Sequence, residues 1–143
     1  FFEIVGDATK LMLFHVVNCI TVTKIRLRNP VYSSASAVSE YAIRMLDNFC
    51  CSKLFLGVDG IDPEYGLSTT HIQEACLNQA MIAAATKTIV LADSSKFGRR
   101  GFSKICNMSD IDWVITDSGI SPKMLEAIEE QGVKVTIVPL PEA

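Results

Sequence analysis

Short apolar runs rich in β-branched residues alternate with helical patterns along most of this sequence. Four such runs cover residues 53–58, 88–92, 111–116 and 133–138. A strand with a nearly continuous apolar run is buried on both faces, as happens in a parallel sheet that helices cover. The sequence therefore predicts an α/β fold: a Rossmann-like, mostly parallel sheet with helices on both faces.

Helical patterns lie between these runs. An apolar stripe at helical spacing occupies residues 38–49, and an alanine-rich helix is predicted over residues 72–86. The clearest helix begins at Ser121, a suitable N-cap, with Pro122 in its first turn and Gly132 just past its end. These ends predict that the last two strands are joined by a helix.

The N-terminal third is less regular. Its pattern predicts a strand over residues 1–5, a helix over 8–16 and a second strand over 19–27. A loop at residues 28–34 follows directly, because Pro30 and a serine pair interrupt the pattern. No crossover helix is predicted at this point.

Composition excludes several classes of protein. The 143 residues are 49% apolar and 20% charged, with a net charge of −3, which argues against an autonomous nucleic-acid binder. No run approaches the roughly 20 apolar residues that span a membrane, and the first residues lack the basic leader of a signal peptide. Five cysteines without Cys-x-x-Cys spacing are typical of reduced thiols, so we expect a cytoplasmic protein. His15 and His71 lack further ligands at metal spacing, so we expect no metal or other cofactor.

Polar segments follow three of the predicted strands. Asp59 and Asp62 lie in the segment 59–70, Asp93 and Lys96 in the segment 93–101, and an Asp-Ser-Gly sequence begins at Asp117. Ligands of open α/β sheets bind beyond the carboxyl ends of the strands. Asp accepts hydrogen bonds from sugar hydroxyls, whereas Ser and Lys hold anions. The same residues are also common in turns and helix caps, so the pattern indicates a ligand edge without naming the ligand.

The sequences LGVDGID at residues 56–62, TIVLADSSKFG at 88–98 and ITD at 115–117 resemble one particular family. The chain is similar to the C-terminal effector-binding domain of DeoR-type bacterial transcriptional repressors, roughly over residues 38–138. The resemblance implies that residues 1–143 form one sensor domain that binds a phosphorylated sugar or related metabolite. It also implies a homo-oligomer that reaches operator DNA through an N-terminal winged helix-turn-helix domain, which we expect to be absent from this chain, and no association with membranes.

This resemblance suggests a division of roles among the polar residues. We expect Asp59, Glu74 and Asp93, together with Asp62, to hold sugar hydroxyls, and Lys96 with nearby backbone N–H groups to meet the phosphate. The full set of expected effector-binding residues is Gly6, Thr9, Gly57, Asp59, Gly60, Asp62, Thr69, Glu74, Asp93, Ser94, Ser95 and Lys96.

The first loop departs from the family pattern. The family's Gly-Ser-Thr-Thr reads Gly6-Asp7-Ala8-Thr9 here, and the carboxylate of Asp7 would repel phosphate. Arg99 and Arg100 could reach a phosphate, or they could be surface charges or oligomer contacts.

The same domain is similar to ribose-phosphate isomerases. Their Asp-Gly-Ala-Asp motif matches residues 59–62 and their catalytic Glu matches Glu74, whereas their catalytic Lys falls on Tyr65. Aldose–ketose isomerisation needs a base and a cation that stabilises the enediolate, and losing such a cation costs about 3–4 kcal/mol of barrier height. We therefore expect a sensor rather than an enzyme. A sugar-phosphate isomerase and a non-binding oligomerisation domain are the alternatives.

Overall fold

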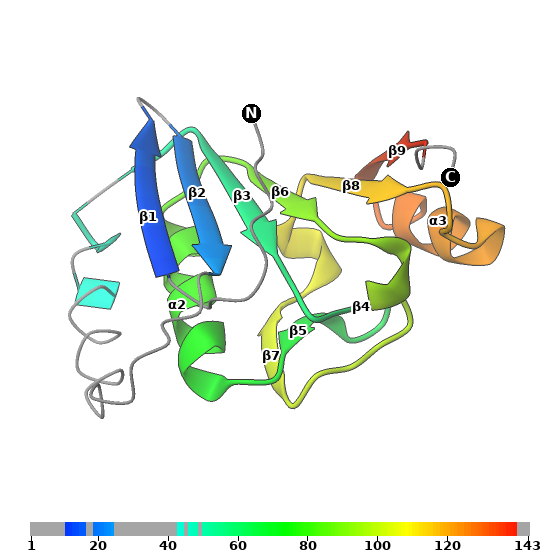
Figure 1. The fold of residues 1–143 in the computed structure, drawn as a ribbon, viewed down its shortest axis with the longest axis horizontal. Coiled ribbons are helices and arrows are strands. Elements are labelled where there is room, and N and C mark those ends of the chain that lie inside the picture. The colour runs from blue at the N-terminus through cyan, green and yellow to red at the C-terminus, as the bar shows by residue number, and fades with distance from the viewer. Residues whose placement is uncertain (1–10, 17–18, 25–42, 45, 49, 140–143) are drawn as a thin grey trace.

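The computed structural model describes residues 11–16, 19–24, 43–44, 46–48 and 50–139 (Figure 1). Its strands are β1 (Leu11–Val16), β2 (Cys19–Lys24), β3 (Lys53–Gly57), β4 (Gly60–Asp62), β5 (Gly66–Thr69), β6 (Thr88–Leu91), β7 (Ser103–Cys106), β8 (Trp113–Asp117) and β9 (Lys134–Val138). Its helices are α2 (Ile72–Ala83) and α3 (Pro122–Glu129), with short 3₁₀ turns η1 (Ser94–Lys96) and η2 (Met108–Asp110).

Six of the described strands form one sheet in the order β1-β2-β3-β6-β8-β9. Only the β1–β2 pair is antiparallel, and the other four neighbouring pairs are parallel. The α/β class and the mostly parallel sheet predicted from the sequence are therefore confirmed. The apolar runs at 53–58, 88–92, 111–116 and 133–138 form β3, β6, β8 and β9 with small differences at their ends.

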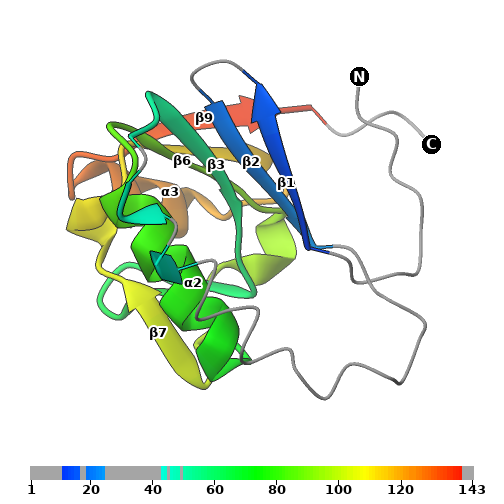
Figure 2. The same ribbon diagram turned by 90° about the vertical axis from the view of Figure 1, so that its left-hand side faces the viewer.

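Both α2 and α3 lie on the same face of this sheet (Figure 2). Each follows a strand and leads to the next strand in the same direction, and right-handed crossovers then place both helices on one side. Leu56, Val90 and Val114 stand side by side in the register and are fully buried in one cluster with Met81 of α2 and Ile128 of α3. In the described part of the chain, the helical layer covers one face, whereas the sequence predicts helices on both.

A second sheet of three antiparallel strands, β4-β5-β7, corrects the prediction of a loop over residues 59–70. Its strands contain Gly, Ser and Thr rather than an apolar run, yet Ser68 and Thr69 are completely buried. The sequence does not predict β4 and β5, because the alternating pattern of a strand weakens when small polar residues occupy buried positions. The helix α2 packs against β5 and β7 on one side and against β3 on the other.

The predicted helix at residues 8–16 is wrong over the residues described, because residues 11–16 form β1. β1 pairs with β2 from Leu11 opposite Lys24 to Val16 opposite Cys19, so a short apolar run that suits either structure is drawn into the sheet. The strand predicted at 1–5, the loop at 28–34, and the residues Gly6 and Thr9 lie outside the described residues.

Candidate functional site

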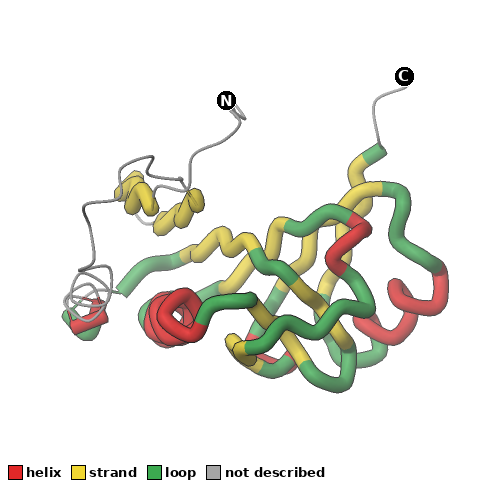
Figure 3. Tube along the Cα trace, turned by 60° about the horizontal axis from the view of Figure 1, so that its bottom comes forward, coloured by secondary structure: helices red, strands yellow, loops and turns green. Residues whose placement is uncertain are grey.

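The carboxyl ends of β3, β6 and β8 lie at one edge of the large sheet, because these strands are parallel neighbours. Their last residues are Gly57, Leu91 and Asp117. Loops run along the strand ends (green in Figure 3), and three of them begin at this edge with the polar segments singled out in the sequence. Gly57 lies beside open space, because no atom lies within 4 Å of a Cβ built on it.

Asp59 is the centre of the first loop. Its Oδ2 accepts hydrogen bonds from Thr69 Oγ1 at 2.9 Å and from the backbone N–H and Oγ1 of Thr70, both at 3.2 Å. The β4–β5 hairpin is what returns the chain to Asp59, and Glu74 follows in the first turn of α2. The structure thus brings Asp59 and Thr69 together. Thr70 was missed because its role depends on the hairpin.

The second loop folds into η1, and Asp93 is its N-cap. Asp93 Oδ1 accepts from Ser95 N–H at 2.9 Å, and hydrogen bonds from Ser95 hold the pKa of Asp93 below its usual value. Ser94 N–H and Lys96 N–H also have protein acceptors, in Asp117 and in the Asp93 carbonyl. The backbone N–H groups expected to meet a phosphate are therefore already paired, which leaves the side chains of this loop to do so.

Lys96 brings a positive charge to this edge. Its side chain is half-buried and forms no hydrogen bond or ion pair with any other described residue. It lies close enough to Asp93 to help lower the pKa of that carboxyl. An ammonium with three unused donors is suited to an anionic ligand.

Asp117 joins the second loop to the third. Its Oδ2 accepts from Ser94 N–H and its Oδ1 from Gly119 N–H, both at 2.8 Å, and these bonds lower the pKa of Asp117. Gly119 lies so close to Ser94 that a Cβ there would collide with Ser94 Oγ. The sequence marked Asp117 as part of a polar loop, but not as the residue that fixes η1.

Asp62 and Gly60 are placed differently from the prediction. Asp62 lies at the end of β4, where its carboxylate accepts from the N–H groups of Glu64 and Tyr65 and from the guanidinium of Arg100. Gly60 packs against backbone, since a Cβ there would stand 2.5 Å from the Arg99 carbonyl oxygen. Gly60 is therefore closely packed, and Asp62 is already engaged by Glu64, Tyr65 and Arg100.

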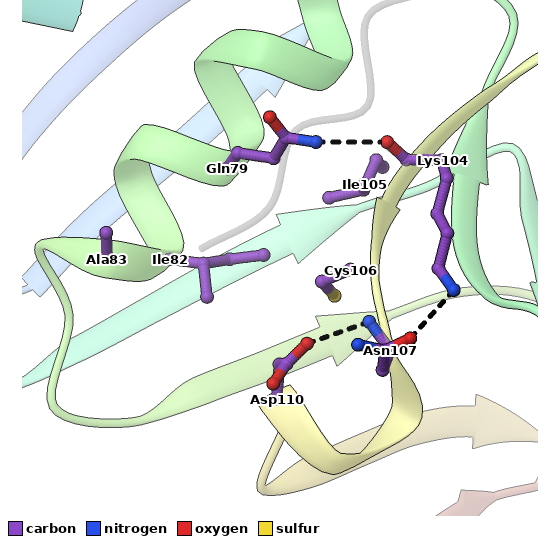
Figure 4. A pocket seen from close by; sticks show the side chains of 8 residues that line it. All are labelled: Gln79, Ile82, Ala83, Lys104, Ile105, Cys106, Asn107 and Asp110. Atoms are coloured by element: carbon purple, nitrogen blue, oxygen red, sulfur yellow. Dashed lines mark hydrogen bonds between the residues drawn. The ribbon is translucent and has the colours of Figure 1, made fainter.

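A separate pocket lies between the second half of α2 and β7 (Figure 4), with a volume of about 590 Å³. Its polar groups pair with one another: Gln79 donates to the Lys104 carbonyl at 3.2 Å, and Lys104 Nζ donates to Asn107 Oδ1 at 2.7 Å. Asn107 N–H in turn donates to Asp110 at 2.8 Å. Cys106 also lines it, and burial raises the pKa of that thiol to about 12. This pocket offers less unpaired chemistry than the sheet edge.

Two further classes of site were searched among the described residues. No group of three or more His, Cys, Asp or Glu is placed to hold a metal ion there. None of the helices described has the length and apolar character needed to cross a membrane.

Comparison with known proteins identifies the family. Residues 31–118 match the family described as the DeoR C terminal sensor domain. The chain belongs to this family. The matched range includes the first two loops at the sheet edge and ends just after Asp117, so the candidate site lies within the family's sensor region.

Relatives of the sensor domain are transcriptional regulators. The chain is 41% identical over 107 residues to the uncharacterized HTH-type transcriptional regulator YulB of Bacillus subtilis, covering 75% of this chain and 42% of that protein. It is 43% identical over 105 residues to the putative aga operon transcriptional repressor of Escherichia coli O157:H7, covering 73% of this chain and 39% of that protein. The HTH-type transcriptional regulator GlpR of Haloferax volcanii is 40% identical over 82 residues, covering 57% and 32%. The chain therefore spans about two fifths of the length of the first two.

Proposed function

We propose that this sensor domain binds a phosphorylated sugar or a related metabolite at the carboxyl edge of its large sheet. The observation that carries the proposal is the ammonium of Lys96, a partly buried residue, which has no hydrogen-bonding partner among the described residues. It stands beside Asp93, and Asp59 follows β3, whose carboxyl end lies at the same edge. Glu74 lies in the first turn of α2. A cation next to several carboxylates fits a ligand that combines an anionic group with hydroxyls.

The roles of the side chains follow from their chemistry. Lys96 meets the phosphate, helped by the hydroxyls of Ser94 and Ser95, because the backbone N–H groups of η1 are already paired. Asp59, Asp93 and Glu74 accept hydrogen bonds from sugar hydroxyls. An ionised carboxylate accepts several hydrogen bonds at once, so Asp59 can serve the loop and the ligand together.

In the complete regulator, the sensor domain acts on DNA through another domain. Its relatives are named HTH-type regulators and repressors, and this chain matches less than half the length of the first two. We infer that effector binding changes operator affinity through a helix-turn-helix domain, in a cytoplasmic homo-oligomer. Such coupling requires that the effector bind one arrangement of the subunits or loops more tightly than another.

Catalysis is not part of this proposal. An isomerase would place a cation where Tyr65 stands. Two cations lie near the Tyr65 ring, Lys104 at 5.2 Å and Arg100 at 5.5 Å, and they are already bound to Asn107 and Asp62. If the chain interconverted an aldose phosphate and its ketose, and Glu74→Gln abolished that activity, the sensor assignment would be replaced by an enzyme.

A thermal-shift screen tests the proposal. The chain is heated with a panel of sugar phosphates and with their unphosphorylated parents, because a ligand at 100 times its Kd adds about 2.7 kcal/mol of stability. We expect one phosphorylated compound to raise Tm, and Lys96→Ala to abolish the shift. Lys87→Ala is the matched control, since Lys87 is exposed just before β6, at the opposite edge of the sheet. A shift of equal size in Lys96→Ala, or no shift with any compound, contradicts the proposal.

A further inference from the structure

Arg100 holds the segment that follows η1. Its Nε donates to Asp62 Oδ2 at 2.9 Å and its Nη2 to Asp62 Oδ1 at 3.0 Å, a two-point contact across 38 positions of sequence. Nη2 also reaches Glu64 at 3.4 Å, and the guanidinium lies 5.5 Å from the centre of the Tyr65 ring. Paired donors on one carboxylate fix the direction of the side chain as well as its distance.

The same segment is fixed at two backbone positions on either side of Arg100. Gly98 N–H donates to the Ile61 carbonyl at 2.8 Å, and Gly101 N–H donates to Ser68 Oγ at 2.8 Å. Ser68 is completely buried in β5. Residues 97–101 are therefore seated along β4 and β5, directly after Lys96. We name this segment the anchor segment.

Asp62 already accepts four hydrogen bonds from the protein. An ionised carboxylate offers about four acceptor sites. Oδ1 accepts from Glu64 N–H, Tyr65 N–H and Arg100 Nη2, while Oδ2 accepts from Arg100 Nε. The Asp62 side chain is also only 15% exposed. Most of the acceptor capacity of Asp62 is therefore used within the protein, and Oδ2 retains one further position.

We propose that Arg100 is a positioning residue of the effector site: through Asp62 it seats the anchor segment and so fixes where η1 presents Lys96. Asp62 then acts through Arg100 without touching the effector. The effect on binding rests on the proposed function, whereas the seating of the anchor segment does not. We call the two-point contact between Arg100 and Asp62 the clamp. Without it, the loop adopts its binding-competent conformation less often. If that conformation is populated to about one tenth, the apparent Kd rises about tenfold.

A double-mutant cycle separates positioning from direct contact. Asp62→Asn keeps an amide oxygen for the N–H groups of Glu64 and Tyr65 but removes the charge that holds Arg100. Inorganic phosphate is the probe, and its Kd is measured for the wild type, Asp62→Asn, Arg100→Gln and the double variant. We expect each single change to raise Kd about tenfold and the double change to raise it no further, because both remove one clamp. Arg100→Lys should bind phosphate more tightly than Arg100→Gln, because a lysine can still form a single contact with Asp62.

Hydrogen exchange tests the clamp without any ligand. We expect Arg100→Gln to accelerate amide exchange at Gly98 and Gly101 about tenfold or more, while amides of β6 and β8 keep their rates. Arg99→Gln is the matched control, because it removes the same charge from the neighbouring exposed position and should leave both glycines protected.

The outcomes are distinct. If wild-type and Arg100→Gln chains exchange at the same rate at Gly98 and Gly101, the positioning role is wrong. If the fold increases in Kd of the two single variants multiply in the double variant, Asp62 contacts the ligand directly and the positioning role of Arg100 is again wrong. If the wild type binds neither phosphate nor any sugar phosphate, the proposed function fails, and the exchange rates alone then decide whether Arg100 seats the anchor segment.

Discussion

Single residues at tight turns are the first determinants of this site. Gly66 begins β5 with φ +97°, and a Cβ there would collide with the carbonyl oxygen of Cys106 in β7. Only glycine combines this backbone conformation with so close an approach of two strands. The hairpin that returns the chain to Asp59 therefore requires glycine at position 66.

Gly66→Ala should destabilise the chain more than Gly132→Ala. Both glycines have positive φ, but nothing lies within 4 Å of a Cβ built on Gly132. Gly132→Ala should therefore cost about 1–2 kcal/mol for the left-handed conformation alone, and Gly66→Ala should add the collision with Cys106. Urea unfolding of both variants measures the difference. Equal midpoints would mean that β5 and β7 are not as close as described.

Cys106 should react slowly with thiol reagents. Burial raises the pKa of its thiol to about 12 from the ordinary 9.0, so its thiolate fraction at pH 8 is about a thousandfold lower than that of an unperturbed thiol. Cys50 and Cys76 are exposed and serve as internal controls. Iodoacetamide labelling followed by mass spectrometry should find Cys106 modified last of these three. Labelling of Cys106 as fast as Cys76 would contradict its burial.

How far single residues could be predicted depends on the range of their contacts. Asp93 and Lys96 were expected at the site because the D-S-S-K sequence and the preceding strand lie within a few residues of each other. Arg100 was left open between several roles because its partner, Asp62, is 38 positions away. The prediction that Asp62 binds sugar came from its motif alone, and its Arg100 contact argues for a different role.

At the scale of elements, the second loop is held by a neighbouring strand. Asp117 at the end of β8 accepts from Ser94 N–H in η1 and from Gly119 N–H in the loop before α3. One carboxylate thus sets the positions of two loops at the carboxyl edge of the sheet. We expect its removal to loosen both.

Asp117→Asn should make the free energy of unfolding fall less steeply as the pH is lowered. The pKa values of Asp62, Asp93 and Asp117 are all lowered in the folded chain. Carboxyls with a depressed folded pKa stabilise the fold above their unfolded pKa, near 4, and this contribution disappears as pH falls through the folded pKa. Urea midpoints at pH 7, 5 and 3 should therefore fall with pH, and fall less steeply for Asp117→Asn. Glu129→Gln, at an exposed position, is the control. If the urea midpoints of wild type and Asp117→Asn fall equally steeply with pH, the role of Asp117 in holding both loops is contradicted.

Elements were predictable where burial left a continuous apolar pattern. The strands β3, β6, β8 and β9 and the helix α3 met that condition. The small sheet β4-β5-β7 did not, since its buried positions include Gly60, Ser68 and Thr69. The segment 11–16 was misassigned because a short apolar run fits a helix and a strand equally well, and only its pairing with β2 decides between them.

At the scale of the whole molecule, topology gathers the site. Parallel strands β3, β6 and β8 bring their carboxyl ends to one edge, although their last residues, Gly57, Leu91 and Asp117, are 34 and 26 positions apart in the sequence. This arrangement was predictable from the alternation of strands and helices and from the rule for open α/β sheets. Family membership adds the sensor role, while the effector itself stays a prediction.

The most direct test maps where the effector binds. The ¹⁵N-labelled chain is titrated with the sugar phosphate that gives the largest thermal shift, and amide chemical shifts are followed. The account predicts the largest changes at Asp59, Ser95, Lys96 and Gly119, at the carboxyl edge of the sheet, with the changes lost in Lys96→Ala. Changes centred on Gln79 and Asn107, in the pocket between α2 and β7, would contradict it.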